Sequence, residues 1–164
     1  MLVLRVYDGW LKLLEQVSSP LLLAIRLIWG LGFFQTGLGK LQNLERTAGF
    51  FASIGIPLPK LNALMAGGTE MVGGILLILG LGGRIAPVPL VFTMLVAFAT
   101  ADRGSIVDAW TAHDLDKLTS AAPFPFLLAS LLVLVFGPGK FSLDQVLGSH
   151  VRKALESKAD AKSG

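Results

Sequence analysis

Hydrophobic residues along the chain are gathered in four long blocks instead of recurring at the spacing of a soluble amphipathic fold. Such blocks are typical of helices that cross a membrane. At about 1.5 Å per residue, the first three can cross a hydrocarbon core of about 30 Å, the third only barely. The fourth is uninterrupted only over 124–136 and reaches span length by including Pro123 and Pro125, which would kink its first turns. The pattern predicts an all-α integral membrane four-helix bundle, a domain of residues 20–147 with spans at 20–39, 61–82, 85–101 and 119–136.

Two further segments flank this domain. In residues 1–19, apolar side chains recur at alternating steps of four and three from Val3 to Val17, with charged residues between them. This spacing predicts an amphipathic interfacial helix along the membrane surface; the alternative is a soluble helix packed on a partner. Residues 148–164 are rich in alanine and charge and predict a charged cytoplasmic tail. Between the first two spans, Phe50 and Phe51 precede several helix-breaking residues, and a short interfacial helix is expected there.

The turns between the blocks indicate how the helices run. Only residues 82–84 separate the second block from the third, so these two should be antiparallel neighbours. Four crossings place both termini on one side of the membrane. That side carries eight lysine and arginine residues against five on the other, although five of the eight follow the fourth span. By the positive-inside rule we expect both termini in the cytoplasm.

The composition supports a membrane location and narrows the chemistry. The 164 residues are 53% hydrophobic and 15% charged, against about 25% charged in soluble domains. The chain contains no cysteine, so disulfides, iron–sulfur ligation, covalent haem attachment and a thiol nucleophile would need another subunit. The net charge of +3 is scattered over loops and tail without a nucleic-acid-binding motif. The expected partner is therefore a lipid bilayer and not a nucleic acid.

Two ionisable residues, Arg26 and Glu70, stand well inside expected spans. Each costs about 2.5 to 3.5 kcal/mol at a helix centre on insertion scales, so both should face the bundle interior. Counted from the cytoplasmic ends, Arg26 lies about 9 Å deep and Glu70 about 18 Å deep, a difference that a leaning arginine side chain would narrow. We expect the two to meet. Three interpretations stay open: an ion pair that only fixes helix register, a polar pocket for a small redox molecule or a proton, and an arginine that reaches the interface alone.

Small residues predict which helix faces meet. The second span has a stripe of small residues at helical spacing around Glu70, and such a stripe lets another helix approach closely. In the first span, Arg26 and Lys40 belong to a face whose members also recur at steps of four and three. We predict that these two faces are in contact. They consist of Ala63, Ala66, Gly67, Glu70, Gly73 and Gly74 on the second span, and of Arg26, Gly30, Phe33, Gly37 and Lys40 on the first.

The remaining candidate chemistry is weak. No histidine stands inside an expected span, which argues against a haem held between two histidines. His113 and the aspartates near it are more typical of a solvated loop than of a metal site, so no metal site is predicted. The tryptophans could stack on a quinone ring, but Trp10 and Trp110 occupy positions where interfacial belts place tryptophan.

Four features together resemble the DoxX/DoxD-like family of small four-helix membrane proteins: an arginine in the first span, GLGK at 37–40, GGTEMVGGILLILGLGGR at 67–84 and GPGKFSLD at 137–144. The resemblance covers residues 20–147. It implies a multi-pass protein of the bacterial cytoplasmic (inner) membrane, linked to oxidoreductase assemblies, including electron transfer from thiosulfate to quinone, and to redox-stress complexes. The positions that match polar family positions are Arg26, Lys40, Glu70, Arg84 and Asp144. An acidic residue expected near the start of the fourth helix is missing from AAPFPFLLAS at 121–130.

These observations lead to two main hypotheses of function. The first is a membrane component of a quinone-linked oxidoreductase or redox-stress assembly, with redox centres on partner subunits. Its candidate buried polar or quinone-binding site consists of Arg26, Glu70, Lys40 and Arg84; no covalently bound cofactor and no particular catalytic residue is expected. The alternative is a non-catalytic accessory subunit that packs against a larger respiratory or photosynthetic membrane complex. A small-solute or proton transporter is a third hypothesis, but the polar path through the bundle is thin.

Overall fold

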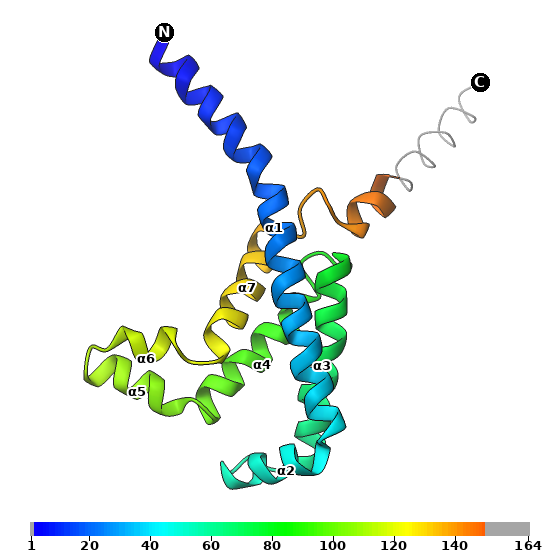
Figure 1. The fold of residues 1–164 in the computed structure, drawn as a ribbon, viewed down its shortest axis with the longest axis vertical. Coiled ribbons are helices and arrows are strands. Elements are labelled where there is room, and N and C mark those ends of the chain that lie inside the picture. Colours follow the sequence, from blue (N-terminus) through cyan, green and yellow to red (C-terminus); the bar gives the residue numbers. More distant parts are fainter. Residues whose placement is uncertain (1, 150–164) are drawn as a thin grey trace, which may run out of the picture.

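The computed structural model describes residues 2–149, and of residues 2–15 it describes only the side chains of Tyr7, Trp10 and Leu14. Every regular element in this range is a helix, which confirms the all-α prediction (Figure 1). The helices are α1 (Leu2–Gln42), α2 (Leu44–Ser53), α3 (Pro59–Leu79), α4 (Pro87–Thr100), α5 (Arg103–Thr111), α6 (Leu115–Thr119) and α7 (Pro123–Phe136). Residues 143–149 are also helical. The tail expected at 148–164 lies, from residue 150 on, outside the described residues.

The first helix differs from the expectation. A span was expected to begin at Pro20, but α1 runs through this proline without a break. With 41 residues, α1 is about 62 Å long, twice a hydrocarbon core of about 30 Å. Its part from Gln16 to Gln42 is long and apolar enough to cross a membrane. The segment 1–19 is therefore no separate helix: its described part is the start of α1, and its position along the membrane surface stays a prediction.

Within the described range, two helices have the length and composition of a membrane span: Gln16–Gln42 of α1, and α3. Both α4 and α7 have 14 residues, about 21 Å, because a proline begins each of them and the preceding residues belong to turns. A third span results only if α4 and α5, which meet at a bend of 70°, are taken together. The four-helix count of crossings therefore stays a prediction.

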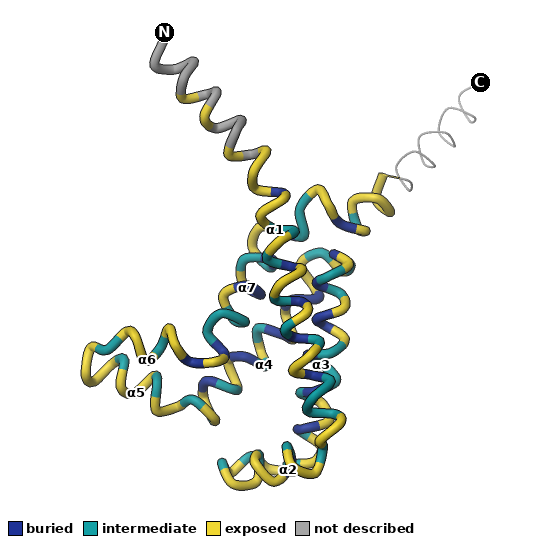
Figure 2. Tube along the Cα trace, in the orientation of Figure 1, coloured by how far each residue is buried: buried dark blue, intermediate teal, exposed yellow. Residues whose placement is uncertain are grey.

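The surface of the long helices is largely apolar, and two of their charged residues are buried. Figure 2 shows exposed positions along the outer sides of α1 and α3. They include Ile28 and Met65, which are 64% and 59% exposed, while Arg26 and Glu70 are 1% and 2% exposed. This arrangement is unfavourable in water but is expected of a protein whose outer surface contacts lipid.

Glycines bring α1 and α3 into backbone contact. A Cβ atom on Gly37 would lie 2.4 Å from the backbone nitrogen of Met71, and one on Gly74 would lie 2.6 Å from the carbonyl oxygen of Gly30. No side chain fits at such distances, so only glycine allows this approach. The two faces predicted from small-residue spacing therefore do meet.

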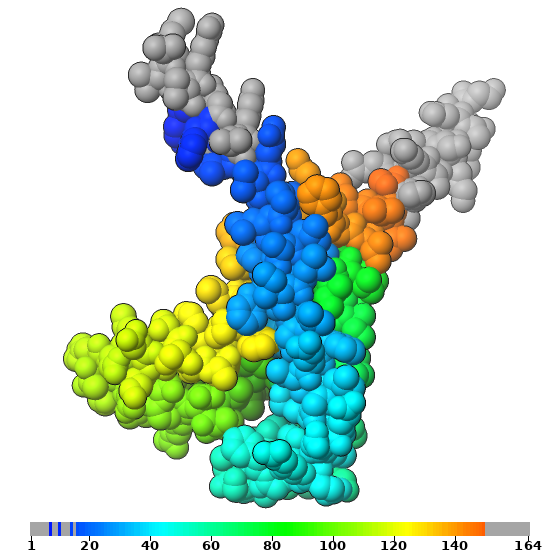
Figure 3. Space-filling model, viewed as in Figure 1, coloured from blue at the N-terminus to red at the C-terminus, as the bar shows by residue number. Residues whose placement is uncertain are grey.

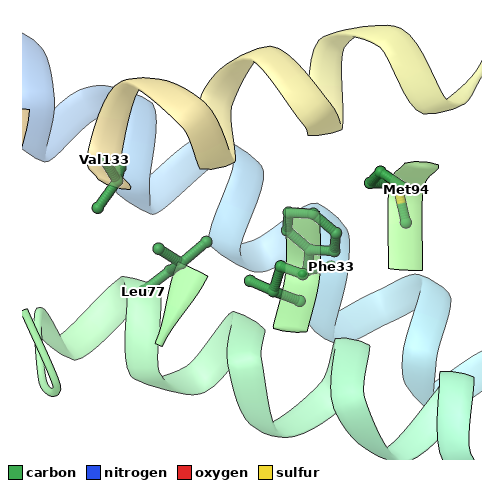
Figure 4. Packing of buried hydrophobic residues seen from close by; sticks show 5 residues of the cluster. Phe33, Leu77, Met94 and Val133 are labelled. Carbon is green, nitrogen blue, oxygen red and sulfur yellow. The ribbon is translucent and has the colours of Figure 1, made fainter. Parts of the chain in front are cut away.

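Gly73, which precedes Gly74 in the sequence, serves a different contact. A Cβ on Gly73 would lie 2.6 Å from a methyl group of Leu90, so α3 approaches α4 on this side and α1 on the side of Gly74. Between these helices and α7 lies the apolar core, in which side chains from α1, α3, α4 and α7 converge (Figure 4). Its buried members are Phe33, Leu77, Leu90, Met94 and Val133.

The helices divide the molecule into two ends. In Figure 1, the first described residues of α1 and the segment after α7 lie at one end, and α2 crosses the other. The short helix expected between the first two spans is α2, which is confirmed. Helices α5 and α6 form an arm that projects sideways from the end of α4 (Figure 1). The sequence analysis treated this region only as a polar stretch, and its two helices were not predicted.

Candidate functional site

A cavity of about 470 Å³ lies between α1, α2, α3, α4 and the start of α7. Figure 3 shows the molecule hollowed between α2 and the α5–α6 arm, which both adjoin this region. The lining is mostly apolar, with aromatic and aliphatic side chains that include Phe50, Phe51, Ile54, Met65, Phe92, Met94 and Phe126. Its polar members are Thr36, Lys40, Asn62, Thr69, Glu70, Thr93 and Thr100. A mostly apolar cavity with a few polar groups is the usual form of a small-molecule site.

An ion pair forms the charged part of the cavity wall. The Lys40 ammonium donates a hydrogen bond to Glu70 Oε2 at 2.5 Å. The Glu70 side chain is only 3% exposed, whereas that of Lys40 is 29% exposed. A carboxylate at this depth is costly without a counter-charge, so Lys40 stabilises its ionised form.

The pair also offers unused hydrogen-bonding capacity to the cavity. Glu70 Oε1 accepts no hydrogen bond from any described residue. Every fully buried polar side-chain atom of the described residues has a hydrogen-bond partner. Since Oε1 has none, this oxygen must be partly accessible. Because Glu70 lines the cavity, we infer that the accessible surface of Oε1 faces it. Lys40 has three N–H donors, of which Glu70 takes one. A ligand in the cavity therefore meets a donor and an acceptor side by side.

The register of α1 against α3 explains why Lys40 and Glu70 meet. The two helices are antiparallel, with Gly30 beside Gly74 and Gly37 beside Gly67. Lys40 lies one helical turn beyond Gly37, and Glu70 lies about one turn from Gly67 in the opposite direction. The long lysine side chain points back toward the start of its helix and spans this offset to reach the carboxylate. Arg26, about one turn before Gly30, comes level with the end of α3.

The expected contact between Arg26 and Glu70 is therefore wrong. The Arg26 guanidinium donates hydrogen bonds to carbonyl oxygens only: Nε to Leu77 at 2.8 Å, Nη2 to Ile78 at 3.0 Å, and Nη1 to Phe141 at 2.9 Å and to Pro138. Leu77 and Ile78 belong to the last turn of α3, where carbonyl groups lack the usual partner four residues on, although Leu77 also accepts from the Gly80 nitrogen at 3.2 Å. Arg26 thus caps α3 and holds the segment that follows α7.

We call the hydrogen bonds that hold the segment after α7 against the end of α3 the Arg26 anchor. The motif GPGKFSLD at 137–144 adds further contacts to it. Asp144 accepts a hydrogen bond from the Gly82 backbone nitrogen at 3.1 Å, and its own nitrogen donates to Gly80 at 3.3 Å. Gly80 has a φ of +67° and leaves no room for a side chain, because a Cβ would lie 2.3 Å from the Arg26 guanidinium. Arg84 is exposed and lies near Gly137. Of the four predicted site residues, only Lys40 and Glu70 are thus brought together in the cavity.

Several cavity residues were missed by the sequence analysis. Thr93 and Thr100 recur on α4 at helical spacing, and Phe126 of α7 closes the inner wall, where its ring packs edge-on against Phe33 at 4.8 Å. A stripe of threonines within an apolar helix was a usable signal for an inward face. Phe126 carried no such signal, since a phenylalanine near a proline is common in any apolar helix.

The fold and the cavity define a class of protein. Long apolar helices, apolar outer surfaces and a buried ion pair that lines a cavity together describe a multi-pass membrane protein with an internal polar site. The DoxX family model matches residues 21–103. The chain belongs to the DoxX family.

Similar proteins agree with this assignment. An uncharacterized membrane protein of Mycobacterium tuberculosis is 34% identical over 159 residues, which cover 85% of this chain and 88% of the relative. The inner membrane protein YphA of Escherichia coli is 31% identical, over 78% of this chain and 91% of its own length. CatD of Bacillus subtilis, which carries a provisional oxidoreductase name, is 41% identical over 48% of this chain and 57% of its own length. No solved structure matches the chain.

Proposed function

We propose that this protein is the membrane component of a quinone-linked oxidoreductase or redox-stress assembly of the bacterial inner membrane. The observation that carries the proposal is the apolar cavity with the Lys40–Glu70 pair in its wall. A quinone combines an apolar ring and tail with oxygen atoms that need hydrogen bonds, and the cavity offers both environments. The inner-membrane relative YphA and the oxidoreductase name of CatD support the proposal from outside the structure.

The pair suits both redox forms of such a ligand. A quinone oxygen only accepts hydrogen bonds, and Lys40 has donors to spare. A quinol hydroxyl also donates, and Glu70 Oε1 is an open acceptor beside Lys40. The same ring oxygen can therefore stay bound before and after reduction. The electrons come from a redox centre on a partner protein, since the chain has no cysteine for a metal cluster.

The proposed topology has both termini in the cytoplasm. The support is the excess of lysine and arginine on that side, eight against five. In this orientation, α2, whose residues line the cavity, lies toward the opposite side of the membrane from the segment after α7, which Arg26 holds (Figure 1). A tag accessible only from outside the cell at either terminus would contradict it.

Quinone binding can be followed through Trp29. Its ring packs edge-on against Phe126 at 5.1 Å, and Phe126 lines the cavity. Trp10 and Trp110 are exposed, so replacing both by phenylalanine leaves Trp29 as the single reporter among the three tryptophans. Adding decylubiquinone or a short-chain menaquinone to the detergent-purified protein should quench its fluorescence with saturation.

We expect Glu70→Gln and Lys40→Met to weaken quinone binding about tenfold or more, which is about 1.4 kcal/mol. Lys40→Met removes the donor to the quinone oxygen, and Glu70→Gln removes the negative charge that holds the Lys40 ammonium in place. The control is Lys60→Met, which breaks the exposed ion pair of Lys60 with Glu45 outside the cavity and should bind like the parent. Quenching that does not saturate, or that is equal in all variants, would contradict the proposal. Co-purification with a complex already complete in redox centres would favour the accessory-subunit alternative.

A further inference from the structure

The cavity opens sideways, through the flank of the bundle. Its exposed lining residues with large side chains lie mostly on α3 and α4: Met65 is 59% exposed, Phe92 is 68% exposed and Val96 is 38% exposed. All three are apolar and belong to apolar helices, so their exposed surfaces face lipid. The rim of this opening is therefore built for contact with acyl chains.

The opening arises because α3 and α4 separate away from their shared turn. Near the turn, Gly73 lets Leu90 pack against α3 at close range. Toward α2, Met65 and Val96 both line the cavity instead of closing it. The helices thus form a wedge with its wide end toward α2, and Glu70 lies about 16 Å from the start of α3, well inside the membrane-spanning length.

The charge of the inner wall restricts what can bind. Lys40 and Glu70 neutralise each other, so the pair attracts neither an anion nor a cation strongly. Its free donor and acceptor match an uncharged hydroxyl or carbonyl group. A volume of about 470 Å³ holds a head group of ring size, with a tail continuing past Phe92 into the lipid.

We infer that the cavity is filled from the bilayer, through the opening between α3 and α4, by an amphiphile with an uncharged hydroxyl or carbonyl head and an apolar tail. The head reaches the Lys40–Glu70 pair and the tail stays between the two helices. This goes beyond the proposed function, because it fixes the entry route and the class of ligand whether or not the ligand is a quinone. A phospholipid with a charged head does not fit this description.

Two alanines on α4 allow a matched test. Ala97 lines the cavity, whereas Ala99 is exposed and does not. The probe is a long-chain alkylphenol with a diazirine in its chain, added to the protein in liposomes and activated by light. We expect adducts to concentrate on residues 62–69 and 92–100. Ala97→Trp should lower them about tenfold, and Ala99→Trp should leave them unchanged.

Three outcomes would overturn the inference: equal losses in both variants, adducts spread evenly over lipid-facing positions such as Val72 and Val88, or equal labelling by a short, water-soluble phenol that carries the same diazirine. If Ala97→Trp does not purify as a uniform species, Thr93→Phe narrows the same cavity and serves in its place. Native mass spectrometry then separates the sources of a natural ligand, since quinones and neutral glycerolipids differ in mass. Labelling that follows this pattern without quinone quenching would retain the entry route and reject the quinone.

Discussion

A single methyl group at Gly37 is expected to separate α1 from α3 and to destabilise the protein by about 3 kcal/mol. In Gly37→Ala, the added carbon would lie 2.4 Å from the Met71 nitrogen and 2.6 Å from the Gly67 oxygen. Both are backbone atoms, so no side-chain rotation relieves the overlap and one helix must move. The contact between α1 and α3 is the most extensive between any two helices of the described residues. In lipid the hydrophobic effect does not drive helices together, so nothing replaces this packing when it is lost.

Gly39 provides the control for this substitution. It lies on the same helix two residues away, and a Cβ there would meet no atom within 4 Å. Gly39→Ala should therefore unfold like the parent in a denaturant titration in detergent, while Gly37→Ala should unfold earlier. Because Lys40 follows Gly37 by one turn, Gly37→Ala should also weaken quinone quenching of Trp29. Equal midpoints for the two variants would show that α1 and α3 are not packed at this register.

The contact between α1 and α3 was predictable because it depends on side-chain size alone. Glycines at steps of four and three mark a face that can approach another helix, and Gly30, Gly37, Gly67 and Gly74 all occupy the predicted faces. Spacing along one helix identifies a face. It does not determine how far one helix is shifted along the other.

That shift decided the partner of Glu70. Counting depth from assumed span ends left Arg26 and Glu70 about 9 Å apart, and the long arginine side chain was expected to close the gap. The structure places Arg26 level with the end of α3, where backbone carbonyls accept all of the hydrogen bonds that it donates to described residues. Backbone acceptors exist at every position, so no sequence pattern distinguishes those at 77, 78, 138 and 141. Lys40 was on the predicted face and among the candidate site residues, but it lay just beyond the expected end of the first span at residue 39.

The region between α4 and α7 was hard to predict for a different reason. Residues 102–122 are polar enough to resemble a loop, and their two short helices contain no buried residue. Apolar periodicity, the main signal for a helix, is produced by burial and is therefore weak here. The prolines at 123 and 125 were expected to kink a longer span, but they begin α7 instead, because proline suits the first helical turn.

The second large effect is expected at Arg26. In Arg26→Met, four carbonyl groups from two distant segments lose a donor, and the segment after α7 loses the hydrogen bonds through which Arg26 holds it to α3. Buried carbonyls without partners cost about 1 to 3 kcal/mol each unless the segment moves out to water, so we expect a loss of about 3 to 5 kcal/mol. Arg26→Lys keeps the charge but not the planar fork that reaches both segments, and it should restore only part of the stability.

Trypsin can report on this anchor directly. Lys140 lies in the segment after α7, between Pro138 and Phe141. The carbonyl groups of these two residues accept hydrogen bonds from Arg26. Release of this segment should make cleavage after Lys140 faster in Arg26→Met than in the parent, under conditions in which the helices stay folded. The matched control is Arg84→Met, which removes an exposed arginine near the same segment and should leave both stability and cleavage unchanged. Unchanged cleavage in Arg26→Met would mean that Asp144 and its contacts to Gly80 and Gly82 suffice to hold the segment, and that Arg26 is buried for another reason.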